Sequence, residues 1–491
     1  MKIDYNNRFK TLDSLLKNAI NEQKREYTYT YPPKRAYNEI NDPDEFVRQA
    51  WEGYEEGAVA LYAHIPYCPP RQIPQPLLQK PNIKSDELQE IWGKESCGFC
   101  NLFGIPVYGN DWKEQISDYM NTLSDEILLY EEIFGQNHEI ASIYFGGGTP
   151  SLGSPEDFTK VFESIRDIFG EIPEDIEISL EASPETIKSF DEMKDYRDIG
   201  FNRISFGIQS FNLDEITMIG RPAQRSYLKT SKDVVTWAKQ AGFKNINIDL
   251  IMGLPLQTKE NFNSSLAQAI DLDPDTITLY SIAMRGETGF GRCVSHNLIQ
   301  PHSPQFIAEL YDSARTLLED EGYKQKTSTQ WIKQETGGYK QQENMYNMIP
   351  ELGVGAGART AALNAHYSID YAVSYEESKK IIDQWNQKIK NRDFPATHGF
   401  ILDKDEKKRK RIILQLLSPN GLNSENYQKE FENHPNDDFP EEFAAIGINE
   451  LIEEGEGFIY FNEKGIQYSS VATRLFWSER VEQAVSEYKT K

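Results

Sequence analysis

Six short apolar runs, each followed by an amphipathic segment, most strongly constrain how this 491-residue chain can fold. The runs are rich in β-branched residues and almost continuously apolar, which is typical of strands buried on both faces of a parallel sheet. They span residues 58–65, 140–145, 176–181, 203–209, 246–252 and 276–283. Helix-like segments follow them at 112–134, 155–169, 226–241 and 258–270. This alternation predicts an α/β fold, a partial (β/α)6 barrel, with its chemistry at the carboxyl ends of the strands.

The charge of the chain excludes several classes of protein. It has 52 Lys+Arg against 77 Asp+Glu, a net charge of −25, which makes nucleic acid an improbable partner. No run approaches the about 20 apolar residues of a membrane span, so no membrane contact is expected. The first residues lack the apolar core of a secretory signal, and the expected compartment is the cytoplasm.

Four cysteines occur, at positions 68, 97, 100 and 293. Cys68 directly follows the first predicted strand, and Cys97-Gly-Phe-Cys100 is a CxxC pair. Two thiolates at this spacing can share a metal or a cluster, or form a redox pair. A zinc ion is an alternative, with His64 as a fourth ligand. Cys293 is predicted to be a small buried residue.

Five motifs carry a family resemblance. Tyr62-x-His64-Ile-Pro-Tyr-Cys68 resembles the motif that opens the radical S-adenosylmethionine (SAM) core in the oxygen-independent coproporphyrinogen III oxidase superfamily, which also contains haem chaperones. Four more motifs match in order, at Gly146–Ser151, Glu177–Glu181, Asn202–Phe211 and Asn247–Pro255. The resemblance covers most of the chain, and implies a radical SAM barrel.

The resemblance also implies cofactors and the residues that hold them. Three cysteines would bind three irons of a 4Fe–4S cluster, and the fourth iron would bind SAM. The implied metal ligands are Cys68, Cys97 and Cys100. The implied SAM-binding residues, for one or two SAM molecules, are Tyr62, Gly147, Gly148, Thr149, Glu181, Gln209, Arg221 and Asp249. No catalytic residue is assigned.

The residue types are consistent with those roles, although each has a structural alternative. Glycines at 147 and 148 allow a ligand to approach the backbone closely, but also suit a tight turn. Glu181 ends an apolar strand, where a carboxylate needs a partner. Asp249 lies inside another apolar strand, and its alternative role is that of a buried acid bonded to neighbouring backbone.

The spacing of the cysteines departs from the family pattern. The family has three residues between the first two cysteines, whereas 28 separate Cys68 from Cys97. We interpret residues 69–96 as an insertion in the cluster loop, with a helix at 85–92, because the motif resumes as Cys97-Gly-Phe-Cys100 with the expected aromatic residue before the last cysteine. Closing a loop of this length costs only a few kcal/mol, so cluster assembly is still possible. The alternative is a degenerate relative that has lost its cluster.

Four regions are predicted along the chain. They are an N-terminal arm (1–55), a radical SAM barrel core (56–300), a barrel extension that lines the substrate site (301–402) and a C-terminal winged-helix-like domain (403–491). The extension carries Glu351-Leu-Gly-Val-Gly-Ala-Gly-Ala-Arg359, which resembles a glycine-rich segment of the family. The basic run at 407–411 is predicted to be a solvated helix face, because acidic residues surround it.

The resulting hypothesis is an enzyme that reductively cleaves SAM at a 4Fe–4S cluster and starts radical chemistry on a small organic substrate, tetrapyrrole-like by resemblance. A two-SAM methyltransferase or cyclopropanase and a haem-binding chaperone are the alternatives. An electron donor such as flavodoxin or ferredoxin is the expected partner. Leu102 stands where the decarboxylases of the family have a cysteine. The acidic composition favours a less anionic substrate, unless local arginines compensate for it.

Overall fold

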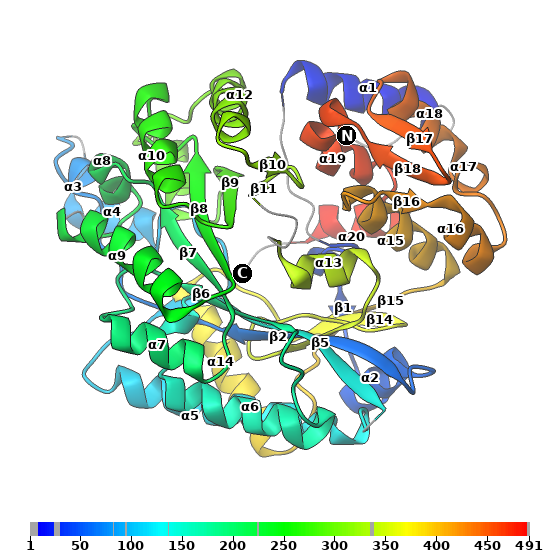
Figure 1. The fold of residues 1–491 in the computed structure, drawn as a ribbon, viewed down its shortest axis with the longest axis horizontal. Coiled ribbons are helices and arrows are strands. Elements are labelled where there is room, and N and C mark those ends of the chain that lie inside the picture. The colour runs from blue at the N-terminus through cyan, green and yellow to red at the C-terminus, as the bar shows by residue number, and fades with distance from the viewer. Residues whose placement is uncertain are drawn as a thin grey trace.

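A parallel sheet of six strands forms the centre of the computed structural model (Figure 1). Each strand pairs with the next along the chain, in the order β2 (Gly57–Ile65), β5 (His138–Gly147), β6 (Glu177–Ala182), β7 (Arg203–Gln209), β8 (Asn245–Met252) and β9 (Thr276–Ser281). The structure describes residues 8–23, 30–81, 83–93, 96–135, 137–222, 225–333 and 338–488. The predicted partial (β/α)6 barrel is therefore confirmed.

Helices on the outside of the sheet connect these strands (Figure 1). They include α5 (Trp112–Leu129), α6 (Pro155–Phe169), α7 (Phe190–Asp198), α9 (Arg225–Ala241) and α10 (Lys259–Asp271). Helix α6 begins with a capping box, because Ser154 accepts from the Asp157 backbone and Asp157 accepts from the Ser154 backbone. Apolar faces of these helices and both faces of the strands form one large core.

Short strands extend both edges of the parallel sheet. Next to β2, the chain adds β12 (Glu351–Val354) in parallel, and then β13 (Thr360–Ala361), β14 (Ala365–Ser368), β15 (His398–Ile401) and β1 (Asn38–Glu39). Next to β9 it adds β11 (Gln330–Ile332) and β10 (Lys324–Gln325). The glycine-rich segment therefore begins in a strand that lies beside the strand of the cysteine motif.

The C-terminal region has its own apolar core. A three-stranded sheet of β16 (Leu422–Asn423), β18 (Phe458–Phe461) and β17 (Ile452–Gly455) packs with α15 (Lys404–Leu417), α16 (Ser424–Phe431), α18 (Pro440–Ile448), α19 (Glu463–Arg474) and α20 (Glu479–Glu487). This arrangement agrees with the predicted winged-helix-like form. Helix α1 (Arg8–Asn21) of the N-terminal arm packs on α18, and not on the barrel.

The insertion is folded, and its predicted helix is confirmed. It forms α3 (Gln75–Leu78) and α4 (Ser85–Trp92), which pack against α8 (Leu213–Met218) and α11 (Gly289–Ser295). Leu88, Trp92, Phe290 and Cys293 belong to this small core. Cys293 is fully buried, as predicted. Across the described ranges, no helix has both the length and the apolar character needed to cross a membrane.

Candidate functional site

The three cysteines of the predicted cluster lie on one loop region. Cys68 ends β3 (Tyr67–Cys68), which pairs in parallel with β4 (Ile105–Pro106) just after the CxxC pair. The Cys100 backbone N–H donates to the Cys97 carbonyl at 2.9 Å, which closes a tight turn between those two residues. All three side chains are partly exposed.

Both ends of the insertion are held at the same place in the fold. The Gln72 N–H donates to the Gly220 carbonyl at 3.1 Å, and the Gly98 N–H donates to the Ile219 carbonyl at 3.2 Å. Ile219 and Gly220 are consecutive residues at the end of α8. The insertion therefore leaves and rejoins the cluster loop at one point, so its length does not move Cys97 away from Cys68.

The thiols interact with each other and with two arginines. Burial and the neighbouring Cys100 raise the pKa of Cys68 to about 11. Burial also raises the pKa of Cys97, but Arg71 and Arg221 lower it more, and its pKa lies below the ordinary value. A cluster needs thiolate ligands, which these arginines stabilise. The donor set therefore fits a cluster.

A single zinc ion fits these residues less well. Within the described residues, no three His, Cys, Asp or Glu side chains gather closely enough to hold one metal ion. His64, the proposed fourth ligand, contacts Tyr62 OH through Nδ1 at 3.1 Å and the Phe103 carbonyl through Nε2 at 2.8 Å. The cysteines of a cluster bind different irons, so they need not converge on one point.

Arg71 and Arg221, the two arginines beside Cys97, each interact with other protein groups. Arg71 comes from the insertion, is buried, and forms an ion pair with the half-buried Glu185. Arg221 donates through Nη1 to the Tyr227 hydroxyl at 2.8 Å and to the Gly207 carbonyl. The sequence analysis assigned Arg221 but missed Arg71 and Glu185, because nothing in the composition of the insertion indicates a return to the barrel.

Glu181 is fixed by hydrogen bonds at the carboxyl end of β6. It accepts from Tyr144 OH at 2.6 Å and from the Gly147 N–H at 3.0 Å. Burial raises its pKa to about 7. The Tyr144 ring stacks on Tyr62, with 6.0 Å between the ring centroids. Three residues predicted to bind SAM, Tyr62, Gly147 and Glu181, therefore belong to one set of contacts.

Asp249 belongs to a second polar group, two strands away. It accepts from Asn247 Nδ2 at 2.7 Å and from Ser205 Oγ at 3.2 Å, and burial raises its pKa. This matches its structural alternative, except that the partners are side chains. Asp249 pairs in register with Gly207, whose carbonyl accepts from Arg221.

Gln209 adopts a backbone conformation that is uncommon for glutamine. Its φ is 73°, and the register between β7 and β8 shifts between Gly207 and Gln209. A β-carbon at Gly207 would lie 2.8 Å from Gln209 Nε2 and 3.8 Å from an Arg221 amino group. The bulge thus turns Gln209 toward Arg221, and such local strain is concentrated at functional sites.

The fold itself explains Gly147 and Gly148. A β-carbon at Gly147 would lie 2.5 Å from the His64 ring, and one at Gly148 would lie 2.6 Å from the Tyr67 carbonyl. The next residue, Thr149, donates its backbone N–H to the same carbonyl at 2.7 Å. Both glycines therefore allow the end of β5 to pack beneath the cysteine loop, and their approach to a ligand stays a prediction.

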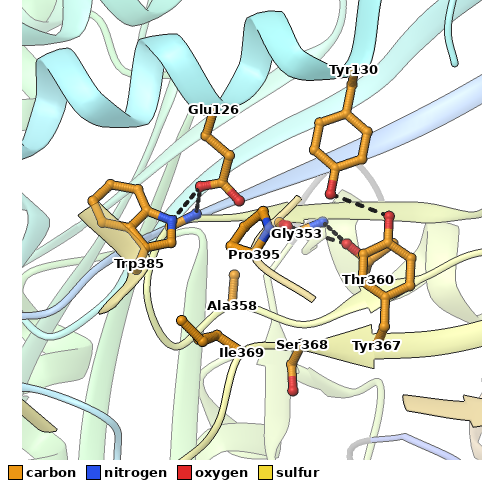
Figure 2. A pocket seen from close by; sticks show the side chains of 11 residues that line it. Glu126, Tyr130, Gly353, Ala358, Thr360, Tyr367, Ser368, Ile369, Trp385 and Pro395 are labelled. Atoms are coloured by element: carbon orange, nitrogen blue, oxygen red, sulfur yellow. Dashed lines mark hydrogen bonds between the residues drawn. The ribbon is translucent and has the colours of Figure 1, made fainter. Parts of the chain in front are cut away.

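Glu126 of α5 forms a hydrogen bond with the glycine-rich segment, although the sequence analysis gave this residue no role beyond its place in a helix. Glu126 accepts from the Gly355 N–H at 2.6 Å and from Trp385 Nε1 at 2.8 Å. Figure 2 shows this carboxylate among the residues that line a small cavity. The volume of the cavity is about 10 Å³, close to that needed for one water molecule. Burial raises the pKa of Glu126 to about 7.

Comparison with known proteins identifies the superfamily. Residues 93–269 match the family model described as the Radical SAM superfamily. The haem chaperone HemW of Haemophilus influenzae is 32% identical over 307 residues, which cover 61% of this chain and 69% of that protein. The chain belongs to the radical SAM superfamily. Radical SAM proteins use a 4Fe–4S cluster and SAM, and these are its cofactors.

Two further comparisons extend over most of this radical SAM chain. An oxygen-independent coproporphyrinogen III oxidase of Helicobacter pylori is 26% identical over 420 residues, covering 85% of this chain and 84% of that protein. The solved structure of the coproporphyrinogen III oxidase HemN of Escherichia coli covers 92% of this chain with a TM-score of 0.74. At 22% identity, that structure shows a shared fold.

Proposed function

We propose that this chain is a radical SAM enzyme that acts on a small tetrapyrrole-like substrate, as a relative of the coproporphyrinogen oxidases. The main support is that both ends of the insertion are bonded to the same turn, so that Cys97 and Cys100 lie on the same loop region as Cys68, with Arg71 and Arg221 beside Cys97. In this proposal Cys68, Cys97 and Cys100 hold the cluster. When bound, the cluster and SAM together supply a one-electron reduction that starts radical chemistry.

The chain's own residues position the cofactors and shield the reaction. Arg71 and Arg221 offset the negative charge of the thiolates, and Arg221 is also close enough to Gln209 to share a carboxylate with it. Glu181 is held in place by Tyr144 and Gly147 before any ligand binds. Such preorganisation lowers the cost of ordering the site on binding. Tyr62, Thr149 and Asp249 complete the proposed SAM site.

The proposed electron donor is a flavodoxin or ferredoxin. A surface cavity of about 370 Å³ reaches Cys100, between the insertion and the loop before α14 (Tyr375–Lys390). Glu90, Gly93 and Ser374 at this cavity are exposed. A donor seated there would reach the cluster without entering the barrel.

A product assay tests the proposed function. Anaerobically reconstituted protein, with dithionite, SAM and coproporphyrinogen III, is expected to form 5′-deoxyadenosine and to change the mass of the tetrapyrrole. Cys97→Ala is expected to lose both the iron–sulfur absorbance and the nucleoside, whereas Cys293→Ala, a buried cysteine outside the loop, keeps both. Absence of 5′-deoxyadenosine from fully loaded protein would contradict enzymatic function.

The same assay separates the alternatives. The sequence identity to a haem chaperone makes haem binding the second candidate function. A shift of the Soret band on haem titration, without formation of any nucleoside product, would support it. Methyl transfer and cyclopropanation rest on the resemblance of the motifs. S-adenosylhomocysteine or methylthioadenosine among the products would support them, and would contradict simple hydrogen abstraction.

A further inference from the structure

Three cations from distant parts of the chain converge beside the glycine-rich segment. Lys34 lies in the arm, in η2 (Lys34–Ala36), Arg359 follows β12, and Lys410 lies in α15. Burial and the nearby charge of Arg359 together lower the pKa of Lys34 and of Lys410 to about 7. Each lysine is thus close to Arg359. Together with Tyr37 and His366, these residues are called the cation wall below.

Protein groups leave this wall incomplete. His366 is 0% exposed and Tyr37 is 8% exposed, yet both ring nitrogens of His366 and the Tyr37 hydroxyl have no hydrogen-bond partner among the described residues. The same is true of Arg359 Nε. Lys410 is 9% exposed, and no described residue forms a hydrogen bond or ion pair with it. Buried polar groups in native proteins are nearly always satisfied, so these atoms indicate a place where a bound molecule supplies their partners.

The acids near the wall do not balance it. Glu351 is 3.8 Å from Arg359 and accepts a hydrogen bond from Gln341. Asp370, which raises the pKa of Lys34, accepts from the Tyr371 N–H at 2.8 Å. Two carboxylates thus face Arg359 and two lysines whose pKa values of about 7 would rise if an anion bound beside them. The molecule that binds there is therefore an anion.

The wall faces the proposed SAM site. Burial raises the pKa of Tyr62, Glu181 raises it further, and Arg359 lowers it, so both side chains are close to Tyr62. Tyr37 and His366 lie edge to face, with 6.4 Å between ring centroids, and Lys410 and Arg359 both lower the pKa of His366. A molecule that contacts Tyr62 on one side can thus place an anionic group against Arg359 on the other.

We propose that the cation wall binds a carboxylate side chain of the substrate. This inference rests on the proposed function, since the tetrapyrrole of that function carries carboxylates at its edge. The guanidinium of Arg359 and the ammonium of Lys410 bind the carboxylate, while Tyr37 and His366 donate hydrogen bonds to it. Lys34 donates to the carbonyls of Gly357 and Ala358, at 3.3 and 3.5 Å, and fixes Arg359 beside them.

The test compares coproporphyrin III with its tetramethyl ester, which has the same ring without charge. Both are titrated by fluorescence into anaerobically reconstituted protein. Each charged hydrogen bond contributes on the order of tenfold in affinity, so we expect the acid to bind at least about tenfold more tightly than the ester. Arg359→Gln and Lys410→Gln are each expected to weaken binding of the acid about tenfold and to leave the ester unaffected.

Lys407→Gln is the matched control, because Lys407 lies on the same helix and binds Asn364 instead. Circular dichroism melting shows whether each variant is folded. Equal binding of acid and ester, or full affinity in folded Arg359→Gln, overturns the proposal. A parallel titration with SAM distinguishes the source of the carboxylate: if Arg359→Gln weakens SAM and not coproporphyrin III, the wall binds the cofactor and the substrate assignment is wrong.

Failure of this inference and failure of the proposed function give different results. Selective binding of the acid without any turnover leaves the cation wall in place and removes the enzymatic function. If the protein turns over the porphyrinogen but binds acid and ester equally, and if Arg359→Gln and Lys410→Gln keep full affinity, the cation wall is not a carboxylate site. The proposed function would then still hold.

Discussion

The molecule holds two groups of cations, and protein groups satisfy one of them more fully than the other. Beside the cysteine loop, Arg71 pairs with Glu185, and Arg221 donates to Gly207 and Tyr227, although its Nε has no partner among the described residues. In the cation wall, Arg359 and Lys410 have no comparable partners among the described residues. The first group therefore contributes to the stability of the fold. The second group lowers stability until an anion binds, and removing a cation from each group should have opposite effects.

The largest expected effect is that of Arg71→Ala in the metal-free protein. Loss of Arg71 leaves the half-buried Glu185 carboxylate with Ser183 and Arg221 but without its ion-pair partner, which should lower the free energy of unfolding by about 3 kcal/mol. Denaturant unfolding followed by circular dichroism measures this. Arg48→Ala is the control, because Arg48 pairs with Asp44 and Glu132 on the surface, where ion pairs contribute about 1 kcal/mol or less. Equal losses in the two variants would contradict the comparison.

The next effect is a loss of stability in acid. Burial raises the pKa of Glu185, but Arg71, Arg221 and Ser183 lower it more, to about 2, against 4.5 for a free glutamate. Between these two pH values the unfolded chain binds more protons than the folded one, so stability present above pH 4.5 is lost as the pH falls toward 2. The loss is about 3 kcal/mol. The free energy of unfolding, measured with urea from pH 6 to 3, should depend less on pH in Glu185→Gln than in the wild type. An equal dependence on pH in both proteins would refute this account.

Lys410 should make stability rise with pH as well, in the alkaline range and for the opposite reason: its charged form destabilises the fold. Burial lowers its pKa to about 7, so between pH 7 and 10.5 the folded chain binds fewer protons than the unfolded one. Stability therefore rises with pH in that range, by up to about 1.4 kcal/mol per unit from this lysine. Lys410→Met should be about 1–2 kcal/mol more stable than the wild type at pH 7. Its stability should also rise less between pH 7 and 9 than that of the wild type. Thermal melting at pH 7–9 measures both, and a destabilised Lys410→Met would show that its charge is already satisfied.

The smallest effect is expected for Arg411→Gln. Arg411 is the neighbour of Lys410, but it pairs with Glu430, whose side chain is 43% exposed. Its removal should change the free energy of unfolding by about 0.5 kcal/mol or less, and the affinity for coproporphyrin III not at all. The same unfolding and titration experiments apply. A change as large as that of Lys410→Met would mean that the whole basic run acts together.

The fold was largely predictable from the sequence because its strands are buried on both faces. Residues 203–209 and 155–169 coincide with β7 and α6, since an apolar run and a capping box define their ends. The N-terminal helix was not predictable in the same way. Its apolar face is completed by α18, more than 400 residues later in the chain, and no local pattern indicates that contact.

The candidate site was predictable where one motif supplies both the residue and its position. Glu181 and Cys97 are of this kind. Lys410 is not: its basic run reads as a solvated face, and that prediction is wrong for Lys410, which α15 buries beside α13 (Lys340–Tyr346). The net charge of −25 likewise favoured a less anionic substrate, whereas the three cations of the wall, of which Lys410 is buried and Lys34 and Arg359 are half-buried, support the opposite.

The anchoring of the insertion at Ile219 and Gly220 has a consequence for how the protein matures. During synthesis, Cys68, Cys97 and Cys100 leave the ribosome more than 100 residues before the carbonyls that tie their loop together. The pairing of β3 with β4 can already join the two halves of the ligand set, but the ends of the insertion stay unanchored until β7 and α8 have formed. Iron and sulfide are therefore best delivered after translation has passed the middle of the barrel, when the carbonyls of Ile219 and Gly220 can hold both ends of the insertion.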